Sequence, residues 1–263
     1  MMTDIRLYMF DTGILKCKYH DIYLNQGGDA DFEIPVPFYF ITHPKGNVII
    51  DGGTPVECAT DAKGHWGKVA EFFTPVLTPE QGCVAQIEKL GFSVDSVKHV
   101  VLSHLHLDHV GAVGRFPNAT HVVQRIEYEY AFTPDWFAVL AYVRKDFDRP
   151  DLKWLILEDA WGDFYDLYGD GSIILIRSPG HTIGHQSILV RTSNGQSVLL
   201  AVDAADTLDH WEERALPGAL HSTIDSVRSV KKLRAVQAKT GALVVAGHDG
   251  PQWATLKKAP DFY

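Results

Sequence analysis

Short apolar runs dominate the hydrophobic pattern of this chain and predict a protein rich in β-strands. Residues 5–10 alternate between apolar and polar positions and predict a first strand, with a turn at residues 11–13. Residues 36–42 and 47–50 predict the two strands of a hairpin. Residues 18–35 are polar, contain glycine and lack a period, so they predict a long loop or arm.

Four more apolar runs lead into a histidine or an aspartate. These runs cover residues 97–102, 173–176, 197–202 and 242–245. The ligand-type residues that follow them in chain order are His104, His106, Asp108, His109, His181, Asp203 and His248. Because a sheet places the ends of its strands side by side, we expect these side chains to meet at one edge of a sheet.

Helical spacing of apolar residues appears in two longer segments. It predicts helices over residues 81–90 and 220–239, each ending close to a glycine. Residues 110–116 predict a short helix, residues 120–123 a strand, and the aromatic-rich residues 125–160 a partly helical segment. Sheet and helix therefore alternate in each half of the chain. The expected fold class is α/β, with two sheets packed together and helices on the outside.

Composition narrows the function classes. The chain is 46% hydrophobic, enough for one sizeable core, and residues 1–263 are expected to form a single domain. The formal net charge is −9 without a run of like charges, which argues against a nucleic-acid partner and against an anionic membrane surface. No apolar stretch reaches the roughly 18 residues that span a bilayer, and no signal peptide is evident.

The cysteines bear on the cellular compartment. Cys17, Cys58 and Cys83 are scattered along the chain and lack C-x-x-C spacing. A sparse and odd set of this kind is typical of reduced thiols rather than of a disulfide framework or a metal site. The sequence therefore predicts a cytoplasmic protein.

The densest group of ligand-type residues is the run His104-x-His106-x-Asp108-His109. Imidazole and carboxylate groups suit zinc, iron or manganese. Residues i and i+2 of an extended loop point the same way, so His104 and His106 can bind one ion. Asp108 and His109 turn toward a neighbouring position, so the loop can serve two ions. The alternative is a polar loop with fortuitous histidines, which the matching residues at three further strand ends disfavour.

The other candidates are single residues near strand ends. A lone carboxylate such as Asp203 is costly after an apolar strand unless it is paired or metal-bound, and it can bridge two cations. His181 and His248 follow their strands in the same way and are expected to be ligands. His185 could be a ligand or a supporting donor, and the supporting role is favoured. Asp51 is expected to hold a ligand histidine by its far nitrogen.

These residues and their order resemble the metallo-β-lactamase superfamily. The set His-x-His-x-Asp-His, then Gly-His, then Asp, then Gly-His spans more than half of the chain. The resemblance implies an αβ/βα sandwich with the site at one edge. It also implies that one ion is held by His104, His106 and His181, that a second is held by Asp108, His109 and His248, and that Asp203 bridges them.

A finer resemblance points to the N-acyl-homoserine lactonases. It is carried by residues 103–109, 179–187, 202–205, 247–249 and 259–263. It implies a metal-dependent hydrolase that opens the lactone ring of N-acyl-homoserine lactones in quorum quenching, or of small γ-lactones such as γ-butyrolactone. Dimers occur in that family, so a homodimer is the assembly to test.

One position departs from that family. A tyrosine that contacts the lactone carbonyl normally stands three residues after the bridging aspartate, and here the position holds Asp206. A carboxylate cannot donate a hydrogen bond to an oxyanion unless it is protonated. Two hypotheses follow, in which Asp206 weakens turnover or has a raised pKa and still donates.

The expected mechanism is metal-assisted hydrolysis. Two divalent ions, with zinc favoured and ferrous iron, manganese or cobalt as alternatives, would lower the pKa of a bridging water and polarise the lactone carbonyl. Asp108 is expected to pass a proton to the leaving ring oxygen. Two alternatives remain open at this point: a dinuclear thioesterase or esterase of glyoxalase II type, and a metal-binding homologue whose catalysis is weakened at Asp206.

Apolar residues near the ligand loop are candidates for the pocket wall. Leu105 and Leu107 lie within that loop, and Phe132, Trp136 and Phe137 lie in the aromatic segment from Tyr128 to Tyr142. For most of these aromatic residues a packed core face is the favoured alternative. Residues 18–35 could cover the pocket or form a dimer contact.

Overall fold

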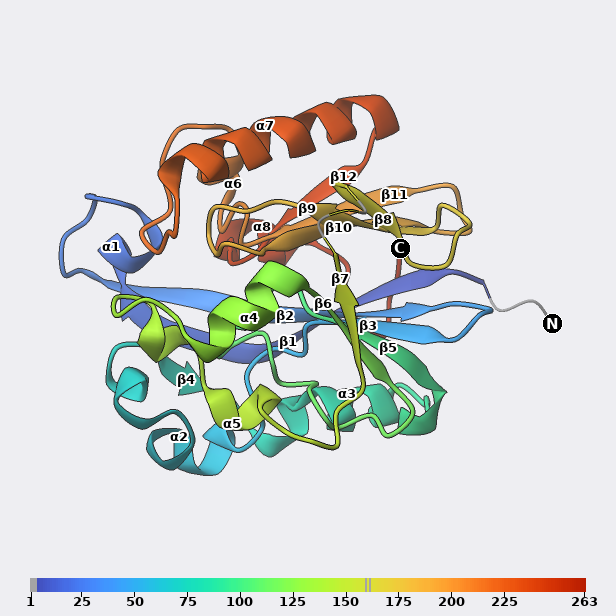
Figure 1. The fold of residues 1–263 in the computed structure, drawn as a ribbon, viewed down its shortest axis with the longest axis horizontal. Coiled ribbons are helices and arrows are strands. Elements are labelled where there is room, and N and C mark those ends of the chain that lie inside the picture. Colours follow the sequence, from blue (N-terminus) through green and yellow to red (C-terminus); the bar gives the residue numbers. More distant parts are fainter. Residues whose placement is uncertain (1–3, 159, 161) are drawn as a thin grey trace.

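Two mixed β-sheets pack face to face, and most of the helices lie on their outer sides (Figure 1). The computed structural model describes residues 4–158, 160 and 162–263. The chain crosses from one sheet to the other between residues 157 and 164. This arrangement confirms the α/β fold class that the sequence predicts.

The first sheet contains the N-terminal half of the chain. Its strand order is β4-β1-β2-β3-β5-β6-β7, and β3, β5, β6 and β7 are parallel to one another. The carboxyl ends of β3 and β5 therefore lie at the same edge. The strands are β1 (Arg6–Lys18), β2 (Asp31–Thr42), β3 (Asn47–Ile50), β4 (Thr74–Val76), β5 (Val97–Val101), β6 (Thr120–Gln124) and β7 (Trp154–Leu157).

The second sheet contains the C-terminal half. Its order is β12-β11-β10-β9-β8, with β10 antiparallel to both of its neighbours and β11 parallel to β12. The carboxyl ends of β9, β11 and β12 consequently share one edge. The strands are β8 (Phe164–Asp166), β9 (Ile173–Arg177), β10 (Gln186–Arg191), β11 (Ser197–Val202) and β12 (Leu243–Ala246).

Helices cover the outer faces of both sheets, with α7 over the five-stranded sheet and α3 beneath the seven-stranded sheet (Figure 1). The longest helix, α7, begins where Ser222 accepts the N–H of Asp225 and ends at Gly241 in the left-handed region. Among the described residues no helix has the length and apolar character to cross a membrane. The α-helices are α1 (Tyr19–Ile22), α2 (Cys58–Trp66), α3 (Cys83–Lys89), α4 (Arg125–Phe132), α5 (Arg144–Phe147), α6 (Leu208–Trp211), α7 (Thr223–Thr240) and α8 (Gly250–Thr255).

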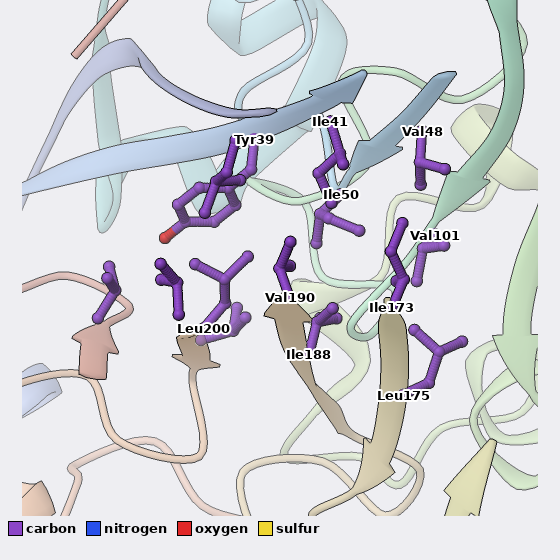
Figure 2. Close-up of a cluster of buried hydrophobic side chains, with 14 of the residues drawn as sticks. Tyr39, Ile41, Val48, Ile50, Val101, Ile173, Leu175, Ile188, Val190 and Leu200 are labelled. Atoms are coloured by element: carbon purple, nitrogen blue, oxygen red, sulfur yellow. The ribbon is translucent and has the colours of Figure 1, made fainter. Parts of the chain in front are cut away.

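The main core lies between the two sheets. Figure 2 shows side chains of the first sheet, such as Ile41 and Ile50, pointing toward Ile188, Val190 and Leu200 of the second sheet. All five of these side chains are fully buried. Burying one such side chain contributes about 1.5–3 kcal/mol, so this layer fixes the position of the two sheets relative to each other.

Three local predictions were wrong. The turn expected at residues 11–13 is an irregularity within β1, which pairs with β2 on both sides of it. The arm expected over residues 18–35 is shorter, because α1 follows β1 directly and β2 already begins at Asp31. Residues 110–116 form turns rather than a helix, since the N–H of Gly111 bonds to Gly53 and Gly114 has a φ of 71°. In each case a contact with a distant segment overrides the local pattern.

Candidate metal centre

The strand ends of the two sheets meet at one edge of the sandwich. The backbone N–H of Gln186 at the start of β10 donates to Ser103 at 2.9 Å, and the side-chain amide of Gln186 donates to Leu102 at 2.8 Å. A third bond at 2.8 Å joins the amide of Gln124 to that of Gln186. These bonds fix the loop after β5 against the second sheet, where the loops after β9, β11 and β12 end.

Three histidines form the first group of converging ligand atoms. His104, His106 and His181 each offer a ring nitrogen, and these nitrogens lie within 4.8 Å of one another. The Nε2 of His181 and the Nδ1 of His106 are 2.9 Å apart. Burial lowers the pKa of His104 and of His106 well below the usual range, which keeps these imidazoles in the neutral form that binds metals.

A second group lies beside the first. One ligand atom from each of Asp108, His109 and His248 lies within 4.8 Å of the other two. The Nε2 atoms of His109 and His248 are each 3.7 Å from Oδ2 of Asp108. The structure therefore brings together, as two neighbouring groups, the six residues that the sequence predicts as ligands of two ions.

Asp203 lies between the two groups. Its Oδ2 is 3.3 Å from Nε2 of both His109 and His181, and its Oδ1 is 3.3 Å from Nε2 of His248. The preceding residue, Val202, has a φ of 49°, which is strained for a β-branched residue and redirects the chain as β11 ends. Asp203 therefore contacts histidines of both groups.

Gly247 allows the two loops to approach. A Cβ atom at this position would lie 2.7 Å from Oδ1 of Asp203 and 2.9 Å from the backbone of Val202. Any larger residue would displace the Asp203 carboxylate or the loop that carries His248. The glycine before His248 is therefore required by the close packing of the β11 and β12 loops.

The far nitrogens of the histidines are held by the surrounding protein. His109 Nδ1 lies 2.9 Å from Oδ2 of Asp51, which is the contact predicted from the sequence. His181 Nδ1 faces the carbonyl of Ala219 at 3.1 Å, and His248 Nδ1 faces the carbonyl of Pro35 at 2.8 Å. Oriented imidazoles of this kind are the usual surroundings of a bound metal.

His185 lies behind the ligand groups. Its Nδ1 is 2.9 Å from the hydroxyl of Ser178, and its ring centre is 5.3 Å from that of His104. Burial lowers the pKa of His185 to about 3. It belongs to none of the converging ligand groups among the described residues, so the supporting role predicted for it remains the better hypothesis.

The donor set fits a pair of divalent cations. Nε2 of His104, Nε2 of His109 and Oδ1 of Asp203 are buried and have no hydrogen-bond partner among the described residues. Buried polar atoms are costly when nothing satisfies them, and the three residues together form a converging group of ligand atoms. Nitrogen and carboxylate ligands in this number suit zinc and related divalent ions.

A cavity of about 430 Å³ opens onto the ligand groups, a size typical of small-molecule sites. His106, Asp108, His181, Asp203, Asp206 and His248 line its polar part. Burial and the neighbouring Asp203 carboxylate hold the pKa of Asp206 well above its usual range. Apolar side chains make up most of the rest of the wall.

Some of the residues predicted to form the pocket wall line the cavity, and others lie in the core or at the surface. Leu107 and Phe137 line the cavity, as do Ile22 and Ile34 from the segment predicted as an arm. Leu105 instead is fully buried in the core cluster beneath the first sheet. Phe132 packs on that cluster, whereas Trp136 is 87% exposed. The aromatic segment therefore contributes to both.

Sequence reasoning missed Glu127 on α4. This carboxylate is fully buried, and it accepts the N–H of Leu105 at 3.0 Å, the N–H of Gly184 at 3.1 Å and the hydroxyl of Tyr142 at 3.1 Å. It thus joins the loop of His104 and His106 to the loop of His181. No local pattern indicated this role, because a Glu in a polar, aromatic helix is usually exposed.

Comparison with known proteins identifies the family. A model described as the metallo-beta-lactamase superfamily matches residues 32–248. The chain belongs to the metallo-beta-lactamase superfamily. Within this superfamily the chain is 63% identical to proteins named N-acyl homoserine lactonase AttM from Rhizobium johnstonii and Agrobacterium fabrum, over 262 residues that cover 100% of both chains in each case.

Solved structures agree with this assignment. A structure of N-acyl homoserine lactone hydrolase, with the product N-hexanoyl-L-homoserine bound at its catalytic metal centre, superposes with a TM-score of 0.87. Its sequence is 27% identical, and the match covers 100% of both chains. The resemblance to the superfamily and the αβ/βα sandwich that it implies are both confirmed.

Proposed function

We propose that this protein is a dinuclear metal hydrolase that opens the lactone ring of N-acyl homoserine lactones, an activity that quenches quorum sensing. The observation that carries the proposal is the convergence of two ligand groups on Asp203 at the end of a largely apolar cavity. The names of the relatives at 63% identity and the product in the superposed structure support the substrate class.

The metal assignment follows the donor set. His104, His106 and His181 would hold one ion, Asp108, His109 and His248 a second, and Asp203 would lie between them. Zinc suits these ligands, and ferrous iron, manganese and cobalt are the alternatives. Bound there, such ions would supply Lewis acidity toward a carbonyl and a lowered pKa for water.

Residues around the metal centre would transfer a proton, bind the acyl chain and support the ligand histidines. Asp108 lines the cavity and would carry a proton toward the leaving ring oxygen. Leu107 and Phe137 offer an apolar wall that would bind the acyl chain and keep bulk water away from the reacting ester. Asp51 and His185 would support the ligand histidines, and Asp206 lies at the position where the resembling family has a tyrosine.

The first experiment loads the purified protein with zinc and, separately, with manganese. Ring opening of γ-butyrolactone and of homoserine lactones with two acyl-chain lengths is then followed by proton release. We expect metal-dependent turnover of the homoserine lactones. The ratio of the turnover rates for the two acyl-chain lengths measures how much the apolar wall contributes to substrate binding. The absence of turnover at two bound ions per chain would overturn the proposal and favour thioester or other ester substrates.

Asp108→Asn tests the proton path. When the variant is loaded to the same metal content as the wild type, it should lose most of its turnover, because the amide cannot pass a proton to the ring oxygen. Near-normal activity at unchanged metal content would remove Asp108 from that path. A cytoplasmic location and a homodimer stay predictions, which cell fractionation and light scattering can test.

A further inference from the structure

Asp206 is fixed in the turn that follows the bridging residue. Its backbone carbonyl accepts the N–H of His248 at 2.7 Å, and the carbonyl of Ala205 accepts the N–H of Gly247 at 3.0 Å. The two loops that carry Asp203 and His248 are therefore bonded to each other through this turn. The Asp206 side chain starts from a rigid position rather than from a mobile loop.

One oxygen of the Asp206 carboxyl group has no protein partner within the described residues. The residue is 3% exposed, and its Oδ1 has no hydrogen-bond donor within the described part of the chain. His210 is the nearest basic side chain, with Nδ1 3.8 Å from Oδ2, but this nitrogen accepts the N–H of Thr207 at 3.3 Å. An unsatisfied carboxylate at a buried site is costly unless a cation lies beside it.

The charges around Asp206 show where such a cation would lie. Asp203 and Asp108 are the acidic residues whose charges act on Asp206, and the histidines that act on it, His248 and His109, already belong to a ligand group. One oxygen of Asp206 lies within 4.8 Å of a ligand atom of His181 and of one of Asp203, and these three atoms form a converging group of their own. The side chain also lines the cavity beside them.

We propose that Asp206 is an additional carboxylate ligand of the ion held by His104, His106 and His181. This inference rests on the metal centre of the proposed function and deepens it. The centre then carries three carboxylates, Asp108, Asp203 and Asp206, in place of two. An added oxygen ligand favours ions that accept more ligands and harder donors, so manganese gains relative to zinc.

Metal retention tests this assignment without any substrate. Asp206→Asn keeps the shape of the side chain and removes its charge, and it is compared with Asp209→Asn. Asp209 lies in the same segment but is partly exposed and pairs with Arg214. Both variants lose one negative charge, so a difference between them reports on ligation rather than on net charge.

In competition with a chelator, Asp206→Asn should lower the affinity of the protein for one of the two ions by about 10-fold or more. The affinity for the other ion should be unchanged. The loss should be greater for manganese than for zinc. Asp209→Asn should retain both ions as the wild type does. Wild-type retention of both ions by Asp206→Asn would overturn the assignment.

Thermal unfolding provides a second measurement. Metal-free Asp206→Asn should be at least as stable as the metal-free wild type, because it removes a buried carboxyl group that lies beside Asp203 and has one unsatisfied oxygen. Its zinc-induced rise in Tm should be smaller. A lower Tm without metal combined with a full zinc response would show a structural role and overturn the proposal. If the wild-type protein binds two ions but opens no lactone, the proposed function is wrong, and the assignment of Asp206 as a ligand is not affected.

Discussion

Glu127 accepts the backbone N–H of Leu105 at 3.0 Å, and through this bond α4 holds the loop that carries His104 and His106. The same carboxylate also accepts the N–H of Gly184, three residues after His181. A single buried side chain therefore positions both loops that supply the first group of histidines.

Replacing Glu127 by alanine should destabilise the protein and loosen metal binding. Two buried N–H groups would lose their acceptor, at about 1–3 kcal/mol for each unsatisfied group. Urea unfolding of the metal-free protein and zinc retention against a chelator measure the two effects. Glu127→Gln keeps one acceptor oxygen and should be intermediate.

The matched control for Glu127 is Glu129→Gln on the same helix. Glu129 is exposed and pairs with Arg125 at i,i+4, and an exposed ion pair of this kind contributes little because solvent screens it. The substitution Glu129→Gln should change neither the free energy of unfolding nor zinc retention appreciably. Equal effects of the two substitutions would contradict the positioning role of Glu127.

Asp51→Asn should weaken metal binding with little change in the fold. Asp51 accepts the N–H of Ser103 at 2.7 Å and its hydroxyl at 2.9 Å, and it faces Nδ1 of His109. An amide is a poorer acceptor for the far nitrogen of a ligand histidine, and such changes typically cost about 10–100-fold in metal affinity. Chelator competition gives the affinity, and circular dichroism reports the fold. The idea fails if affinity is unchanged.

The three cysteines should resist thiol reagents in the native protein. Burial raises the pKa of each of the thiols of Cys17, Cys58 and Cys83 to about 12. The reactive thiolate is therefore nearly absent at pH 8, whereas an ordinary thiol with a pKa of about 8.5 is partly ionised there. Ellman's reagent should find no fast-reacting thiol in native protein and three after unfolding in guanidinium. One rapid thiol under native conditions would refute this.

His99 should make stability fall below neutral pH. Burial lowers its pKa in the folded protein to about 4, whereas the unfolded chain titrates near 6.5. Between these values the unfolded state binds more protons, so stability decreases as pH falls from about 6.5 toward 4. His99→Gln cannot take up this proton and should flatten that slope in urea unfolding at several pH values. The assignment of this pH dependence to His99 is wrong if the wild type and His99→Gln lose stability equally as the pH falls.

Some of the strands, such as β9 and β11, could be predicted from the sequence because each follows a local pattern, whereas β4, β7, β8 and β10 were not predicted. The runs that become β9 and β11 are apolar over their whole length, and each strand was predicted to within about two residues. Gly13 and Gly111 show where local reading failed. The first lies within β1 next to β4, the second bonds across to Gly53, and both contacts join segments that are distant in the chain.

The sequence by itself determined the kind of chemistry. Histidines and aspartates after successive apolar strands predict a metal site wherever the strand ends meet, because ligand type and strand periodicity are local properties. Only the tertiary structure decided the relative positions. Asp203 lies between two histidine groups, Glu127 is buried, and Oδ1 of Asp206 has no hydrogen-bond partner in the described part of the chain. These arrangements arise because the pairing of strands and the packing of the two sheets bring together residues far apart in the chain.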